Sequence, residues 1–294
     1  MTVLLRTGLK RWAVWRKQSV NRRIFAAILT VGGLTVVAKL AAAAKEVVAA
    51  HQFGTSDALD AFLIAFLLPT FAINVVAGSF NAALMPTYIQ VRKHEGHGAA
   101  QRLFSAAMVW STASLIVVSA VLALLASYIL PIVASGFGPE KLALTRSLFY
   151  VLLPALVING LATVWRAVLN SSERFALAAA TPIITAIAAV ALLLMMGGVW
   201  GIYALAVGTV GGFVVEAGLL AWGLRRQKLS LVPRWYGIDP SMRQVINQSV
   251  PVIAGALLLG STPLIDQSMA AMLGPGSGEP FAPPEVMPET GARR

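Results

Sequence analysis

Cysteine is absent from this 294-residue sequence, and charged residues are scarce. Without cysteine the chain can form no disulfide, no thiolate nucleophile and no cysteine-ligated metal site. Charged residues make up 12% of the chain and hydrophobic residues 57%, and the mean hydropathy is +0.76. A single water-facing domain has no use for so much apolar surface, whereas a bilayer requires it. The composition therefore predicts an all-α, polytopic transmembrane helix bundle.

Histidine is also scarce, and no constellation of catalytic residues is found. The three histidines are His51, His94 and His97, and the last two lie three residues apart in a stretch without further metal ligands. A phosphate-binding glycine loop ending in Lys-Ser or Lys-Thr is absent. We therefore expect no enzyme activity, no catalytic residue, no metal site and no cofactor. A membrane-embedded glycan transferase is the enzyme alternative, but it would need a large loop with several carboxylates, and the predicted loops are short.

Seven apolar stretches recur, each long enough to cross a bilayer, which takes about 20 residues of helix. The predicted spans are 24–50, 57–88, 103–134, 144–170, 176–197, 202–224 and 244–273. Proline or glycine occurs inside several of them, and each such residue permits a bend whose freed backbone groups must be satisfied by neighbours. Bends of this kind suit a transporter.

The two ends of the chain differ from the apolar middle. Residues 1–23 combine seven cations with Trp12 and Trp15, which indicates a basic amphipathic segment on the cytoplasmic leaflet. The alternatives are a disordered basic tail and a signal peptide cleaved after the alanines at 42–44. Residues 24–224 form the predicted six-helix lobe, 225–243 a basic loop and 244–273 the seventh span. Residues 274–294 are rich in proline and are predicted to be disordered.

The net charge of +11 would suggest a nucleic-acid partner in a soluble protein, but here the cations gather in alternate loops, so none is expected. Outside the first 23 residues the loop cations are Arg92, Lys93, Arg102, Arg174, Arg225, Arg226, Lys228, Arg234 and Arg243, all in loops after even-numbered spans. The intervening loops carry only Lys141. By the positive-inside rule the N-terminus is cytoplasmic and the seventh span ends outside.

Besides Asp57, at the very start of the second span, the first two spans contain four charged residues, Lys39, Lys45, Glu46 and Asp60. A charge at bilayer depth costs about 2.5–3.5 kcal/mol on insertion scales, so each is expected to face protein or a water-filled cavity. Lys39 and Glu46 are seven residues apart and share a helix face. We expect the lysines to attract an anionic cargo and Glu46 or Asp60 to orient them when the cavity is empty. The alternative is an internal ion pair that only fixes helix packing.

Four polar residues of the later spans are further candidates for a role. Glu216 and Asp266 are solitary carboxylates in apolar helices, so both are candidates for ion coupling. Arg166 is expected to extend toward the cytoplasmic headgroups. Asn159 is expected to form a hydrogen bond between helices.

One helical hairpin carries a specific motif. The residues Phe53-Gly54, Asp60-Ala61-Phe62, Ala65-Phe66 and Leu68-Pro69 are followed by Phe80 and Pro86. This pattern resembles the MurJ/MviN flippases of the multidrug, oligosaccharidyl-lipid and polysaccharide exporter superfamily. Further matches in the same order are Leu169-Asn170, Arg174-Phe175, Pro182 and the glycines from Gly208 to Gly212. The likeness extends from about residue 30 to residue 273.

The resemblance implies a protein of the bacterial cytoplasmic (inner) membrane that moves a polyprenyl pyrophosphate-linked glycan between leaflets by alternating access. The cargo would bind in a central cationic cavity between two lobes. In the family, arginines match Lys39 and Lys45, and an acid matches Glu46. Lysine binds a phosphate as a point charge, whereas arginine can bind two oxygens at once, so charge is retained without the fork geometry.

The sequence departs from the family pattern in the second span. Ile73 and Asn74 stand where the family often has a basic pair, and Ala77-Gly78 stands where it has Glu-Gly with one more residue. Fewer charges would line this cavity, which leaves room for a lipid-linked glycan other than the peptidoglycan precursor.

The resemblance covers one lobe plus one helix of a protein with about fourteen helices. The expected partners are a lipid-linked oligosaccharide and membrane lipids, and either a second half-length chain or a homo-oligomer. Two alternative functions are a cation-coupled drug exporter of the same superfamily and a truncated membrane scaffold without transport activity.

The loop charges predict the sidedness of the chain. A reporter enzyme that is active only outside the cytoplasm should be active when fused after Ser135 and inactive when fused after Lys93. Of these two loops, only the one that contains Lys93 is basic. Reporter activity with the opposite pattern would refute the topology.

Overall fold

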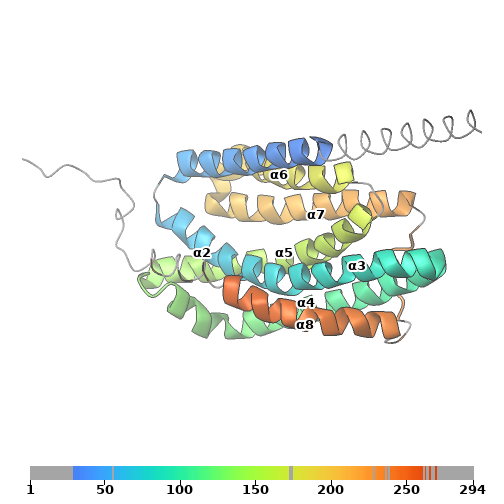
Figure 1. Ribbon diagram of the computed structural model, residues 1–294. Coiled ribbons are helices and arrows are strands. Elements are labelled where there is room, and N and C mark those ends of the chain that lie inside the picture. The colour runs from blue at the N-terminus through green and yellow to red at the C-terminus, as the bar shows by residue number, and fades with distance from the viewer. Residues whose placement is uncertain are drawn as a thin grey trace, which may run out of the picture.

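A computed structural model describes residues 29–54, 56–171, 175–227, 229–235, 237 and 239–260, together with 262, 265 and 269 (Figure 1). The predicted amphipathic segment at 1–23, the tail at 274–294 and Asp266 lie outside the described residues. The same holds for the last part of the predicted seventh span.

The regular elements in these ranges are all helices, which confirms the predicted all-α fold. A first helix covers residues 29–53. The others are α2 (Asp57–Ala72), η1 (Ile73–Gly78), α3 (Ser79–His94), α4 (Gly96–Val133), α5 (Pro139–Ser171), α6 (Phe175–Trp200), α7 (Ile202–Arg226) and α8 (Pro240–Gly260).

Within the described ranges, five helices are long and apolar enough to cross a membrane: Asp57–His94, Gly96–Val133, Pro139–Ser171, Ala176–Trp200 and Ile202–Arg226. They match the second to sixth predicted spans and confirm a polytopic membrane bundle. The helix at 29–53 and α8, which cover the described parts of the first and last predicted spans, are not among the five. The helix at 29–53 is less apolar because it contains Lys39, Lys45 and Glu46, and α8 is less apolar because it begins with a polar stretch.

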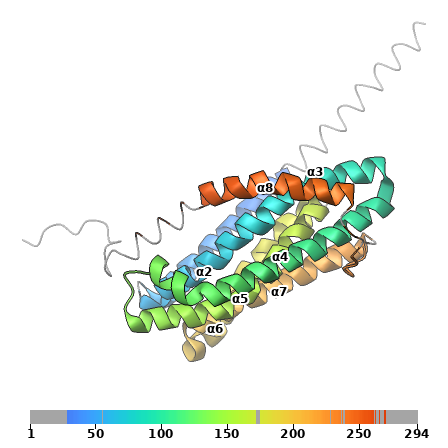
Figure 2. The ribbon, with the colours of Figure 1, turned by 90° about the horizontal axis from the view of Figure 1, so that it is seen from below.

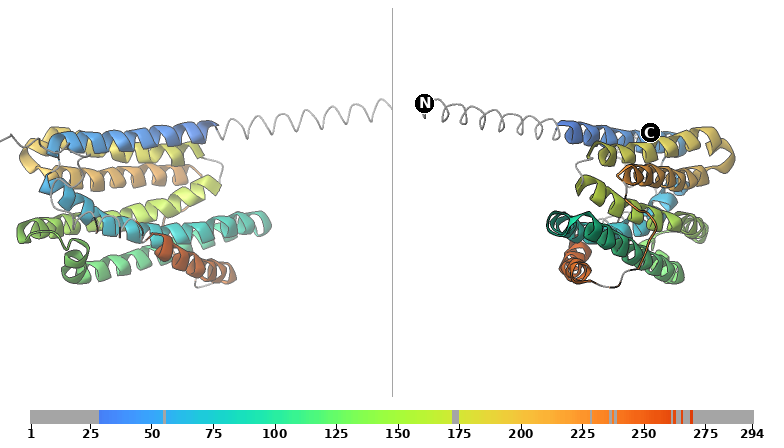
Figure 3. Two further views of the ribbon diagram at one scale, coloured as in Figure 1. Left: turned by 60° about the vertical axis from the view of Figure 1, so that its left-hand side comes forward. Right: turned by 90° about the vertical axis from the view of Figure 1, so that its right-hand side faces the viewer.

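The helices lie lengthwise beside one another in an elongated bundle. The helix at 29–53 and α6 form one edge, α7 follows, α2 and α5 lie in the middle, and α3, α4 and α8 form the opposite edge (Figures 1 and 3). In the view from below, α8 lies beside α3 (Figure 2). One core of buried side chains surrounds Tyr88, Phe104 and Leu220. A second surrounds Phe149 and Leu193, and a smaller third core contains Leu115 and Leu156.

The stretch where the sequence departs from the family pattern is a π-helical segment, η1. It joins α2 and α3 into one 38-residue helix, Asp57–His94. A π-helical turn rotates the residues that follow it relative to an uninterrupted α-helix. On its two sides, α2 packs mainly against α5, whereas α3 packs against α8 and α4 as well as α5.

Two of the basic loops lie at the same end of the bundle, because the segment after α7 is bound to the start of α4. The Gln101 side chain donates to the Ser230 carbonyl at 3.0 Å and accepts from the Ser230 N–H at 3.2 Å. Ser105 likewise accepts from the Arg234 N–H at 2.7 Å and donates to the Arg234 carbonyl at 2.9 Å. The grouping of these cations on one side, which the topology prediction requires, is therefore present in the fold.

Glycines in α7 allow it to approach α6 closely. A Cβ atom added at Gly212 would lie 2.8 Å from Thr185 Cα, and one added at Gly208 would lie 3.0 Å from Ala189 Cα. Small residues spaced four apart allow this kind of backbone approach in membrane helices. The match to the family glycines between Gly208 and Gly212 thus has a packing explanation.

Replacing Gly212 with alanine should destabilise the purified protein in detergent, by about 1–3 kcal/mol, because the added methyl group would force α6 and α7 apart. Thermal unfolding measures the effect. Gly211→Ala is the matched control, since a Cβ at Gly211 meets nothing within 4 Å. Equal stability of the two variants would contradict the close approach.

Candidate functional site

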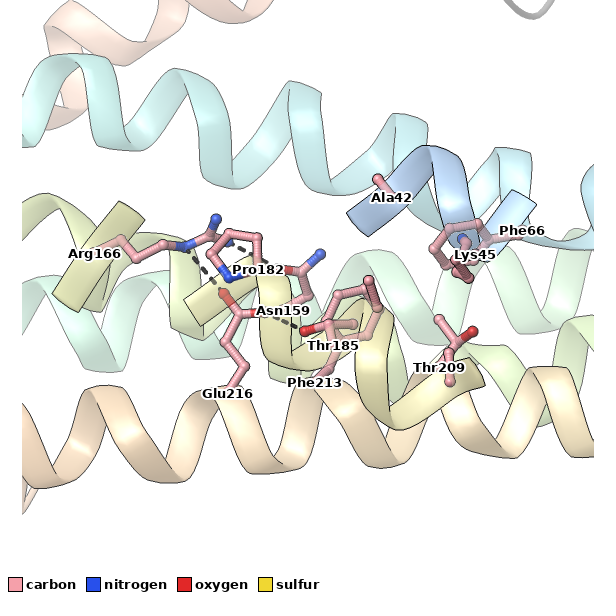
Figure 4. Close-up of a pocket in the computed structure, with 12 residues that line it drawn as sticks. Ala42, Lys45, Phe66, Asn159, Arg166, Pro182, Thr185, Thr209, Phe213 and Glu216 are labelled. Carbon is pink, nitrogen blue, oxygen red and sulfur yellow. Dashed lines mark hydrogen bonds and ion pairs between the residues drawn. The ribbon is translucent and has the colours of Figure 1, made fainter. Parts of the chain in front are cut away.

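A cavity of about 250 Å³ lies inside the bundle, between the helix at 29–53, α2, α5, α6 and α7. Its charged residues are Lys45, Arg166 and Glu216, and Asn159, Thr185 and Thr209 add polar groups (Figure 4). Its other lining residues are Ala42, Phe66, Pro182, Ala186, Ala189 and Phe213. Polar side chains thus converge in an otherwise apolar pocket, which is the usual form of a ligand-binding site.

Glu216 is the most deeply buried charge of this pocket, with 2% of its side chain exposed. The Thr185 hydroxyl on α6 donates to its Oε2 atom at 2.7 Å. Its Oε1 atom lies 3.6 Å from Arg166 Nε, and neither of these two atoms has a hydrogen-bond partner among the residues that the structure describes. Glu216 therefore has one oxygen hydrogen-bonded and the other held only by charge.

Arg166 is held along its own helix. Its Nη2 atom donates to Asn159 Oδ1 and to Thr163 Oγ1, both at 3.0 Å. Its side chain is 25% exposed and points toward Glu216 (Figure 4). The expectation that Arg166 extends to the headgroups is wrong, because these oxygens compensate its charge inside the bundle. The expected interhelical bond of Asn159 is likewise a bond within α5.

Lys45 lines the same pocket from the helix at 29–53, at the end remote from Arg166 (Figure 4). Lys39 and Glu46, on the same helix, are exposed and are not among the lining residues. Of the residues selected from the sequence, the structure therefore brings Lys45 and Glu216 to one cavity and leaves Lys39 and Glu46 outside it.

Asp60 lies in a different cluster, at the start of α2. Lys141 Nζ on α5 lies 2.8 Å from an oxygen of Asp60 and 2.8 Å from an oxygen of Asp57, and 4.1 Å from the centre of the Phe137 ring. The contacts of Asp60 thus go to Lys141 rather than to Lys39 or Lys45. Lys141 is 81 residues away in the sequence, and its only signal there is that it is the single cation of an otherwise bare loop.

The pocket holds two cations against one carboxylate, so its formal charge is positive in an apolar surrounding. In a region of low dielectric constant this excess favours an anionic ligand. In the part of the chain that the structure describes, no group of three or more His, Cys, Asp or Glu side chains could hold a metal ion.

The family model described as "Lipid II flippase MurJ" matches residues 49–279. A curated lipid II flippase MurJ of Burkholderia cenocepacia is 28% identical over 266 residues, which are 86% of this chain and 51% of that protein. A probable lipid II flippase MurJ of Thermotoga maritima is 25% identical over 245 residues, 83% of this chain and 49% of that protein. The chain therefore spans about half the length of these relatives.

Solved structures show the same fold. A lipid II flippase MurJ in an inward closed conformation has a TM-score of 0.65 at 16% identity, covering 82% of this chain and 52% of that one. The Vibrio cholerae MATE transporter VcmN, in its bent form, has a TM-score of 0.68 at 15% identity, covering 84% of this chain and 57% of that one.

The matching family model and the curated relatives are described as lipid II flippases and not as enzymes, and MurJ flippases are proteins of the bacterial cytoplasmic membrane. The resemblance noted in the hairpin motif is confirmed over most of the sequence. The chain belongs to the MurJ family.

Proposed function

We propose that the chain forms the N-terminal, cargo-binding half of a flippase that moves a polyprenyl pyrophosphate-linked glycan across the cytoplasmic membrane by alternating access. The observation that carries this proposal is the cationic pocket inside a lobe of the MurJ fold. A pyrophosphate headgroup is anionic and needs compensation by cations while it crosses the apolar layer.

The cationic residues have different places in this mechanism. Lys45, partly buried in the pocket, attracts the pyrophosphate as a point charge. Lys39 and Glu46 share an exposed face of the helix at 29–53, and a bilayer would not tolerate them against acyl chains. That face therefore lines a water-filled passage between this lobe and a second one.

Asp60 supports the site from a distance. Its ion pair with Lys141 holds the start of α2 against α5, which places Phe66 of α2 at the pocket wall. Glu216, the only carboxylate among the described residues that line the pocket, is the candidate for ion coupling. Movement between inward-open and outward-open states would be driven by an ion gradient or the membrane potential.

The drug-exporter alternative fits the pocket less well. A cationic drug would need an excess of acids in its binding site, whereas Lys45 and Arg166 outnumber Glu216 here. Like charges that face each other cost several kcal/mol of binding free energy.

The proposal predicts faster leaflet exchange of a fluorescent polyprenyl pyrophosphate-linked disaccharide in liposomes that contain the protein than in protein-free liposomes. The chain is reconstituted alone and together with the C-terminal half of the Burkholderia relative. Lys45→Ala should slow the exchange about tenfold or more, because the pyrophosphate loses a cation that it can contact.

Arg146→Ala is the control, since Arg146 is an exposed cation of α5 that does not line the pocket. Exchange no faster than in protein-free liposomes in both reconstitutions would refute the flippase proposal and favour a membrane scaffold. Equal rates for wild type and Lys45→Ala would remove Lys45 from cargo binding.

A further inference from the structure

We propose that Arg166 and Glu216 form a displaceable ion pair, and that the end of the pocket around them is a binding subsite for a phosphate group. In the empty subsite the carboxylate of Glu216 pairs with the guanidinium of Arg166, and a bound phosphate takes the place of that carboxylate. The chemistry of the subsite stands on the geometry alone, and only the identification of the phosphate as that of the lipid-linked cargo rests on the proposed function.

The first argument is the incomplete bonding of the pair. Arg166 uses Nη2 for Asn159 and Thr163, whereas its Nε has no hydrogen-bond acceptor and lies 3.6 Å from Glu216 Oε1. That oxygen also lacks a donor. A buried ion pair that serves only packing is stable when its remaining hydrogen-bonding groups are satisfied. Here a donor and an acceptor face each other beyond hydrogen-bond distance, so a better acceptor can compete for the donor.

The second argument is the place of the pair at a cavity. Both side chains line a space of about 250 Å³, several times the roughly 30 Å³ that one water molecule occupies in the liquid. The pocket that Arg166 lines therefore has room for a phosphate group. The planar guanidinium has N–H groups in a fixed fork, which matches the oxygens of a phosphate better than a lysine ammonium does.

The third argument is that Glu216 has an anchor of its own. Its Oε2 accepts the hydrogen bond of Thr185, and the close approach of α6 at Gly212 keeps Thr185 near. Glu216 can therefore release Arg166 and still remain hydrogen-bonded to α6. In the empty pocket Glu216 supplies the negative charge that Arg166 requires. When a ligand is bound, the phosphate supplies that charge instead.

The fourth argument is the charge of the lining. Lys45 at the other end of the pocket adds a second cation, so the site stays attractive to anions while Glu216 is ionised (Figure 4). Neutralising Glu216 would raise the formal charge of the lining from one positive to two. The carboxylate thus weakens anion binding, so removing its charge should increase the affinity for an anion.

The test measures binding to the full chain in nanodiscs by titration calorimetry, with polyprenyl pyrophosphate and inorganic pyrophosphate as separate probes. Glu216→Gln should bind about tenfold more tightly than wild type, because the competing charge is gone while the shape is kept. Arg166→Gln should bind about tenfold more weakly than wild type. The affinity of Arg166→Lys should lie between those of wild type and Arg166→Gln. Glu140→Gln and Arg146→Gln, exposed residues of α5, are the matched controls and should leave the affinity unchanged.

The opposite signs separate a binding role from a structural one. If Glu216→Gln and Arg166→Gln both lower the thermal stability and neither changes the dissociation constant, the pair is structural and the inference is wrong. Wild-type binding of polyprenyl pyrophosphate with no effect of either variant also overturns the inference but leaves the flippase proposal intact. Variant-dependent binding of inorganic pyrophosphate alone supports the subsite, assigns it to a soluble anion and contradicts the proposed cargo.

Discussion

Charge compensation inside an apolar bundle is the constraint on which the arrangement of this chain depends. Lys141 is compensated by two carboxylates of α2, and Arg166 by two oxygens of its own helix and by Glu216 of α7. The partners of Lys141 are exposed at the start of α2, whereas Glu216 is buried among the helices, where the hydrocarbon of a bilayer offers no partner for Arg166. The two clusters differ in completeness. Lys141 is within hydrogen-bond distance of both of its partners, whereas Arg166 retains an N–H group without an acceptor among the described residues, and the pocket is found beside Arg166.

Backbone packing and charge placement are linked in this fold. The glycines of α7 face the backbone of α6 at Thr185 and Ala189, and Thr185 is also the residue that binds Glu216. Larger residues at these glycines would move α6 away and take the hydroxyl with it. The same close contact therefore serves the stability of the bundle and the orientation of its most buried carboxylate.

Much of the fold could be predicted from the sequence, because apolar span length and the distribution of loop cations are local properties. The five membrane-length helices follow from them, and the motif from Phe53 to Pro86 identified the family. The candidate site was harder to predict. Lys45 and Glu216 could be selected because each is a charge in an apolar stretch, but their common cavity depends on packing between segments about 170 residues apart. The partner of Asp60 was missed for the same reason. Arg166 was misjudged because its acceptors are neutral residues of its own helix, Thr163 one turn earlier and Asn159 two turns earlier.

The side-chain clamp between α4 and the segment after α7 has a mechanical consequence. Gln101 and Ser105 lie one helical turn apart, and each binds both backbone polar groups of one residue, Ser230 or Arg234. A connection fastened at two points cannot swivel as a loop fastened at one point can. Because α8 also packs against α3, it is coupled to its neighbours at its entry and along its length. Tilting of α8 would therefore move α3 and α4 with it, so that the three helices would move as one rigid body.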